Sequence, residues 1–124
     1  MAWSASKVFD QLFLDALENT AAFDLGGTPD TFKCSLWDND ITPDRTVSAA
    51  NSAFGAGQWV SAGNEVFEAG QRATGGVALT TPDLSIPAGG TIMFDAADTS
   101  SGSAADLANV YGIMIYDDTL AAPV

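Results

Sequence analysis

Carboxylates are the residues of this chain best suited to chemistry, and the densest group lies in the acidic loop of residues 38–44, which reads DNDITPD. Oxygen ligands at alternating positions are what Ca²⁺ takes from an EF-hand loop. That motif needs glycine at its sixth position and glutamate at its twelfth, where this chain has Pro43 and Ala49. An EF-hand is therefore excluded. A looser calcium site of the three aspartates stays open beside a simpler interpretation, a turn in which Asp side chains accept backbone N–H bonds.

Other catalytic groupings are weaker. Asp95 with Asp98, and Asp117 with Asp118, are carboxylate pairs that could serve acid–base chemistry only if burial separated their pKa values. Nothing in the sequence places them in a pocket, so we expect solvated turn residues. The chain has no histidine, which excludes the usual serine triad and leaves the single Cys34 without a base. Cys34 falls on an alternating apolar pattern that predicts a buried structural thiol. We expect neither enzymatic activity nor a cofactor or metal.

Four apolar side chains are candidates for contact with another protein: Trp3, Leu14, Trp37 and Trp59. Tryptophan is enriched at interface hot spots, although it is also a routine core residue. Trp37 is the first choice, because it lies on the parity opposite the apolar positions of its strand and borders the acidic loop. Trp3 could anchor an N-terminal arm or staple the first helix to its own domain. Leu14 falls among the polar residues of that helix.

The elements that must position these residues begin with a helix predicted over residues 5–18, where apolar residues recur at helical spacing. Ser4 or Ser6 can cap it, and we expect its apolar arc to pack on the chain's own core. Residues 31–37 alternate as a half-buried strand, and residues 46–54 could form a short helix capped by Thr46. Further short strands are expected at residues 58–61, 65–68, 73–81 and 91–96, with a bend across 82–90.

The last predicted strand, within residues 108–119, is apolar at both parities. Val110, Met114 and Tyr116 lie on one side, and Tyr111, Ile113 and Ile115 on the other. A strand with one face in water should alternate between apolar and polar residues. We therefore expect both faces to be covered, by the chain's own core or by another chain.

Short strands separated by turn residues predict a mainly β chain. We expect a single domain over residues 1–124, an antiparallel β-sandwich or small barrel across 31–119, with the helix of 5–18 on one face or end. A chain of 124 residues suits one domain with one core.

The charge is lopsided, with 16 acidic and 4 basic residues and a net charge of −12. Nucleic acid and anionic membranes are poor partners, because binding to either needs clustered basic residues. We find no signal peptide and no apolar stretch of membrane-spanning length. Low charge density together with 47% hydrophobic residues is typical of a chain with a permanent neighbour, or of an ordinary acidic protein kept soluble by its net charge.

Six stretches follow one another along the chain in a characteristic order: VFDQLFLDAL (8–17), DTFKCSLW (30–37), TPD (42–44), GGVAL (75–79), FDA (94–96) and YDDT (116–119). In this order the chain resembles a family of small structural proteins of tailed bacteriophages. The resemblance implies a β-rich virion component, made in the bacterial cytoplasm and associated with the head as a capsid decoration or cement protein. Similar sequences often continue past the Asp-Asp-Thr turn into another apolar strand. This difference leaves the pairing of the last strand open, and a neighbouring subunit could fill that place.

Together these observations predict a capsid decoration protein on the exterior of the virion, which binds the shell of the major capsid protein and stabilises it. The expected partners are that shell and copies of this chain, as a trimer. A tail or head–tail connector protein is one alternative. A calcium-dependent binding module that uses residues 38–44 and Trp37 is another.

Overall fold

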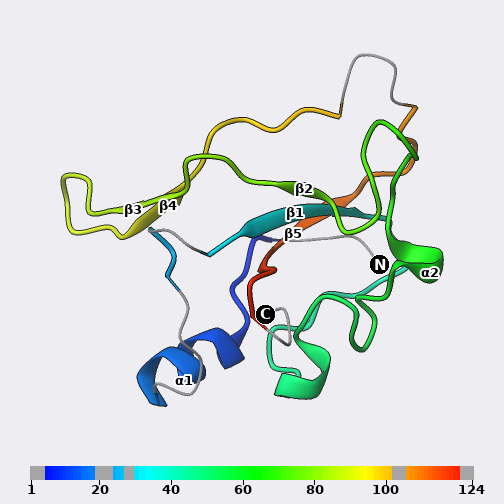
Figure 1. The fold of residues 1–124 in the computed structure, drawn as a ribbon. Coiled ribbons are helices and arrows are strands. Elements are labelled where there is room, and N and C mark those ends of the chain that lie inside the picture. Colours follow the sequence, from blue (N-terminus) through cyan, green and yellow to red (C-terminus); the bar gives the residue numbers. More distant parts are fainter. Residues whose placement is uncertain (1–4, 19–23, 27–29, 102–105, 121–124) are drawn as a thin grey trace.

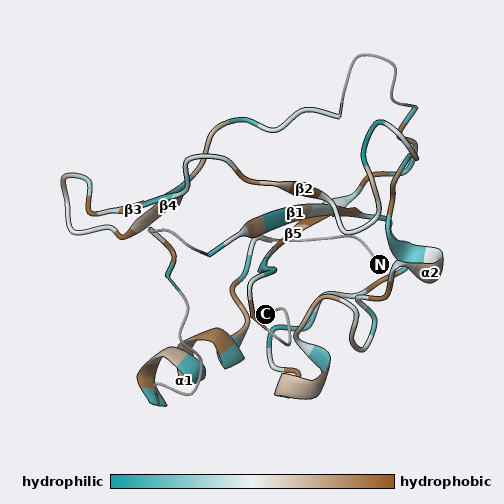
Figure 2. Ribbon diagram, in the orientation of Figure 1, coloured by the Kyte–Doolittle hydropathy of each residue, from teal (hydrophilic) through white to brown (hydrophobic). Residues whose placement is uncertain are grey.

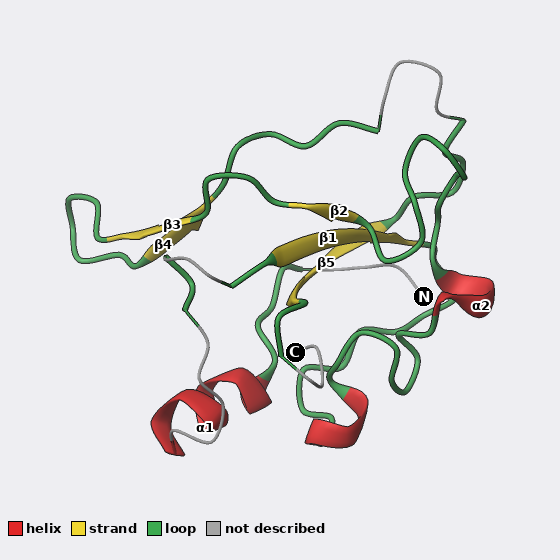
Figure 3. Cartoon of the chain, viewed as in Figure 1, coloured by secondary structure: helices red, strands yellow, loops and turns green. Residues whose placement is uncertain are grey.

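A computed structural model describes residues 5–18, 24–26, 30–101 and 106–120 (Figure 1). The elements in chain order are helix α1 (Asp10–Glu18), strand β1 (Phe32–Trp37), 3₁₀-helix η1 (Ala49–Asn51), helix α2 (Ser61–Asn64), and strands β2 (Val77–Ala78), β3 (Asp83–Ser85), β4 (Met93–Asp95) and β5 (Gly112–Asp117). The described part has more strand than helix, two small antiparallel sheets and a short helix near its N-terminal end (Figure 3). It contains no closed barrel.

The central sheet has the strand order β2-β1-β5. β1 pairs with β5 along its whole length, from Phe32 opposite Asp117 to Trp37 opposite Gly112. On its other side β1 pairs with the two residues of β2. β1 is therefore the middle strand of the sheet, and β5 lies at its edge.

The smaller sheet is the hairpin β3–β4, in which Leu84 lies opposite Phe94. The predicted bend over residues 82–90 is confirmed in its later part, with Gly89 and Gly90 at positive φ in the turn, whereas the strand β3 within it was not predicted. The hairpin contacts the central sheet through an edge-to-face pair of Phe94 and Phe32, whose ring centroids are 5.5 Å apart. Figure 1 shows it projecting beyond the end of the central sheet.

The main core cluster lies under one face of the central sheet and is mainly aromatic, while Phe32 and Cys34 of β1 are buried on the other face. Its buried members are Trp37, Ile41, Trp59, Met114 and Tyr116, with Phe9 and Phe54 packed against them. Residues 41–59 provide the other side of this core, because the segment after β1 folds back beneath the sheet (Figure 1). In Figure 2, hydrophobic colour runs along β5 and also along β2.

The predicted helix over residues 5–18 is shorter than expected. It begins at Asp10 and buries no residue, so the expectation that it packs on the core is wrong for Asp10–Glu18. The residues just before the helix contact the segment of residues 45–59 instead. Phe9 packs edge-to-face on Trp59 with ring centroids 5.8 Å apart, and the Asp10 N–H donates to the Arg45 carbonyl at 3.0 Å. Ser6 is thus outside the helix, and Ser4 lies outside the described residues.

The middle of the chain also differs from expectation. The helix predicted at 46–54 is only the 3₁₀ turn η1, and Thr46 does not cap it but donates its N–H and hydroxyl to Asp44 Oδ1. No strand forms at 58–61, and residues 65–68 contribute only single bridges at Glu65 and Glu68. The expected strands at 73–81 and 91–96 are present as the shorter β2 and β4.

Candidate functional site

The acidic loop of residues 38–44 forms turns stabilised by its own side chains. Asp38 Oδ1 accepts the Asp40 N–H at 2.9 Å. Asp44 Oδ1 accepts both the N–H and the hydroxyl of Thr46, at 2.9 and 2.7 Å, and these bonds lower the pKa of the Asp44 carboxyl. This geometry is that of the simpler interpretation, an aspartate turn. The part of the chain that the structure describes contains no group of three acidic or cysteine side chains placed to hold a metal ion.

The two tryptophans proposed for an interface and visible in the structure belong to the core instead. Trp37 is fully buried, and its ring lies edge-to-face against Trp59 at 5.2 Å between centroids. The parity argument was wrong for Trp37, because the core lies on the face that carries Lys33 and Ser35. Leu14 is exposed on α1, as the sequence pattern suggested. Trp3 lies outside the described residues.

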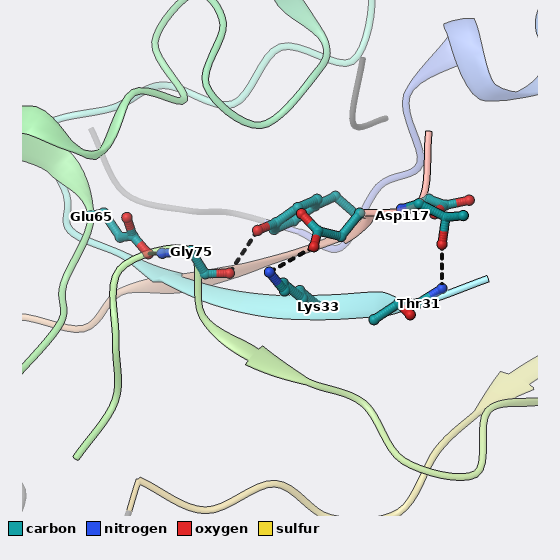
Figure 4. A network of polar contacts seen from close by, with 8 residues as sticks. Thr31, Lys33, Glu65, Gly75 and Asp117 are labelled. Carbon is teal, nitrogen blue, oxygen red and sulfur yellow. Dashed lines mark hydrogen bonds and ion pairs between the residues drawn. The ribbon is translucent and has the colours of Figure 1, made fainter. Parts of the chain in front are cut away.

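Polar groups on the β2 side of the sheet are engaged in a buried network (Figure 4). The Tyr116 hydroxyl donates to the Gly75 carbonyl at 2.7 Å, and the Gly75 N–H donates to Glu65 Oε1 at 2.7 Å. Burial raises the pKa of the Tyr116 hydroxyl, and the charges of Asp118 and Glu65 raise it further. The network therefore ties β5 to the turn before β2 and keeps Tyr116 neutral.

The predicted burial of Cys34 is confirmed. Burial raises the pKa of the thiol, although the Arg72 guanidinium beside it acts in the opposite direction. Arg72 donates to the Cys34 carbonyl at 2.7 Å, so its charged head is used to satisfy the backbone of β1. A thiol that is buried and protonated is a packing group rather than a nucleophile.

The face of β5 opposite the core is apolar and open. Tyr111, Ile113 and Ile115 are 54%, 53% and 46% exposed, whereas Met114 and Tyr116 on the other face are buried. We predicted that both faces of this strand are covered. The chain's own core covers one face, and the other face stays open in the described structure. Free monomers rarely expose contiguous apolar residues in this way, so the open face is the first candidate for contact with another molecule.

The outer edge of β5 is also open. The Asp118 N–H donates to the Thr31 carbonyl at 2.8 Å, which makes these two residues a hydrogen-bonded pair of the antiparallel ladder. Such pairs recur at every second residue, so the backbone groups of Met114 and Tyr116 face β1. Those of Ile113 and Ile115 point away from the sheet, and no described residue pairs with them.

A groove of about 940 Å³ follows this edge. Its walls are β5 from Tyr111 to Asp117, the segment of residues 5–9 before α1, and Phe94 of the hairpin. The lining is mostly apolar, and its charged members are Lys7, Asp44, Arg45 and Asp117, of which Arg45 is paired with Asp10 at 3.1 Å.

Asp117 was expected to be a solvated turn residue and is instead buried, with 1% of its surface exposed. Its Oδ1 accepts the Thr119 N–H at 2.7 Å, but no described residue hydrogen-bonds to Oδ2. Burial raises the pKa of this carboxyl and the Asp30 charge adds to the effect, whereas hydrogen bonding from Thr119 and from the Leu120 backbone acts in the opposite direction. Its neighbour Asp118 points the other way and forms an ion pair with Lys33 at 2.7 Å (Figure 4).

Comparison with family models, with curated proteins and with solved structures found no match for this chain. No described helix combines the length and the apolarity that crossing a bilayer requires. The open edge of β5 was not predicted as a site. The signal for it was present in the sequence, as a strand that is apolar at both parities.

Proposed function

We propose that this chain is a structural protein of a bacteriophage virion, a capsid decoration protein that binds the outside of the major capsid protein shell and stabilises it. The open apolar face of β5 carries this proposal, because such a surface needs a lasting partner. The resemblance to structural proteins of tailed bacteriophages suggests the major capsid protein as that partner.

The energetics of the open face support a stable complex. Complete burial of a large apolar side chain contributes roughly 1.5–3 kcal/mol. Tyr111, Ile113 and Ile115 are each about half exposed, so covering them would contribute on the order of 1 kcal/mol per residue. A ligand that binds only the assembled shell stabilises it by mass action, and many copies multiply the effect.

The charge of the chain is consistent with an exterior position. A net charge of −12 favours docking on a basic outer surface through complementary potentials, and it disfavours contact with packaged DNA. We further propose that docking and self-association, as a trimer on a symmetry axis, complete the β-sandwich predicted from the sequence. In that assembly the shell covers the exposed β5 face, and copies of this chain meet through other surfaces.

The test is thermal rupture of phage particles that lack this chain, with the purified chain added back. We expect the depleted particles to rupture at a lower temperature, and the added chain to restore the original value. An Ile115→Lys chain should fail to restore it, because the charge lies on the open face. An Ile92→Lys chain, altered at an exposed isoleucine outside the groove, should succeed. Equal rupture temperatures with and without the chain would contradict the stabilising role.

A tail or head–tail connector protein is the second candidate, because an open apolar strand edge suits assembly into a ring equally well. Copy number separates the two, since a ring holds far fewer subunits than a shell.

A further inference from the structure

We propose that the open edge of β5 is an acceptor for an extended, basic strand of another polypeptide, which adds to the central sheet beside β5. The inference deepens the function proposed above and rests on it for the source of that strand, the shell protein. The strand-accepting property itself follows from the backbone geometry, the lining of the groove and the charge.

The backbone geometry calls for a polypeptide. The N–H and C=O groups of Ile113, Ile115 and Asp117 point outward at regular spacing, and no described residue pairs with Ile113 or Ile115. An added strand bonds such a row with its own backbone and places alternate side chains on the two faces of the sheet. A lipid or a small apolar molecule would leave these backbone groups without partners, at a cost in free energy.

β5 carries few of the natural devices that protect an edge strand, and its one charged residue is the buried Asp117 at its end. Edge strands are normally shielded by proline, by an inward-pointing lysine or by a covering segment. The sequence of β5, GIMIYD, has neither proline nor lysine. The groove runs along the strand, and its lining includes Phe94, residues 5–9 and residues 42–45. The edge is thus long enough and apolar enough to accept a partner.

Asp117 and the net charge determine the chemistry of the partner. Asp117 shares a face of the sheet with Ile113 and Ile115, and its Oδ2 is buried without a hydrogen bond from any described residue. On an added strand, the residue opposite Asp117 would place its Cβ about 4.5–5.5 Å away on that same face. A lysine or arginine there would supply the missing donor. A second copy of this chain, which also carries a charge of −12, would meet like-charge repulsion instead.

The experiment supplies the strand as a tether. A flexible Gly/Ser linker is added after residue 124, followed by a strand of about seven residues in which Val alternates with Thr and a Lys stands early, to meet Asp117. Tethering raises the effective concentration to the millimolar range, so a weak intrinsic affinity is measurable. Controls are the same tether with prolines in the alternating positions, and the Ile115→Lys and Ile92→Lys chains with the original tether.

Amide hydrogen exchange followed by NMR is the readout. In the untethered chain, Met114 and Tyr116 should exchange slowly and Ile113 and Ile115 quickly. The tethered strand should slow exchange at Ile113 and Ile115 by about tenfold or more. The proline tether and the Ile115→Lys chain should lose this protection, whereas the Ile92→Lys chain should keep it. Replacing the tether lysine by glutamate should reduce the protection, and the pKa of Asp117 should fall only with the lysine tether.

Several outcomes would overturn the inference. Unchanged exchange at Ile113 and Ile115 with every tether would exclude strand addition, even if the chain is abundant in virions. Slow exchange of both amides in the untethered chain, together with a dimer in sedimentation, would make a second copy the occupant. Equal protection by the lysine and glutamate tethers would exclude a basic partner. Absence of the chain from virions would refute the proposed function and leave strand addition standing.

Discussion

Truncation of Trp37 should unfold much of this protein, because the side chain is the centre of the core. Trp37 is fully buried and lies against Trp59 and Phe54, with ring centroids 5.2 and 6.1 Å away. Its Nε1–H donates to Ser35 Oγ at 2.9 Å. The Ser35 hydroxyl in turn donates to the Met114 carbonyl at 3.3 Å.

The magnitude follows from these contacts. Replacing a buried tryptophan by alanine typically costs about 3–5 kcal/mol in transfer and cavity energy. Each lost aromatic pair can account for about 0.5–1.5 kcal/mol of such a loss, and the hydrogen bond for about 1 kcal/mol. A loss of about 4 kcal/mol is a large part of the roughly 5–15 kcal/mol that stabilises a small domain. We therefore expect the Trp37→Ala chain to be largely unfolded at moderate temperature.

Urea unfolding followed by far-ultraviolet circular dichroism measures this change, and the signal does not depend on the tryptophan removed. The matched control is Phe67→Ala, because Phe67 is an aromatic residue that is 47% exposed. Its substitution should change the free energy of unfolding by less than about 1 kcal/mol. If Trp37→Ala and Phe67→Ala shifted the urea midpoint equally little, Trp37 would not be a core residue and the fold described above would be incorrect.

Other predictions concern the sheet and its polar contacts. Gly76→Ala should lower the free energy of unfolding by about 3 kcal/mol or more, since its φ is +79° and a Cβ would lie 2.1 Å from the Cys34 carbonyl oxygen. Gly89→Ala, at φ +100° in open space, should lower it by only about 1–2 kcal/mol. Thermal unfolding of the two variants measures the difference. Tyr116→Phe should lower the free energy of unfolding by about 1–1.5 kcal/mol, because the Gly75 carbonyl loses its hydrogen-bond donor. A change near zero would argue against that hydrogen bond. The raised pKa of Asp117 means that the folded chain binds this proton more tightly, so its contribution to stability increases as pH falls through the folded pKa. Relative to the unaltered chain, Asp117→Asn should therefore have a higher free energy of unfolding at neutral pH, and this difference should shrink in acid. A difference that does not vary with pH would contradict the burial of this carboxyl.

The sequence predicted elements whose signal is local. The alternation of residues 31–37 predicted β1, and the paired prolines and glycines of residues 82–90 predicted the bend of the hairpin. The chain could not reveal from its pattern which face of β1 carries the core. That choice depends on where the segment 41–59 folds back, and it was decided by the long-range contact of Trp59 with Trp37.

Residues that act through long-range partners were missed for the same reason. Arg72 and Glu65 look like surface charges in the sequence, but each is buried, where it satisfies backbone groups of Cys34 and Gly75. Asp117 looked like half of a solvated pair and became a buried carboxyl at the end of β5. The apolar pattern of β5 did predict that something must cover both faces. It could not show that the chain itself would cover only one.

The number of copies of this chain in each virion is the most direct measurement of its proposed role. Quantitative mass spectrometry of purified particles, scaled to the major capsid protein, gives that number. We expect copies on the order of hundreds, as for a protein repeated over a symmetric shell. A few to a few dozen copies would place the chain in the tail or connector and contradict the decoration role, and none would contradict any place in the virion.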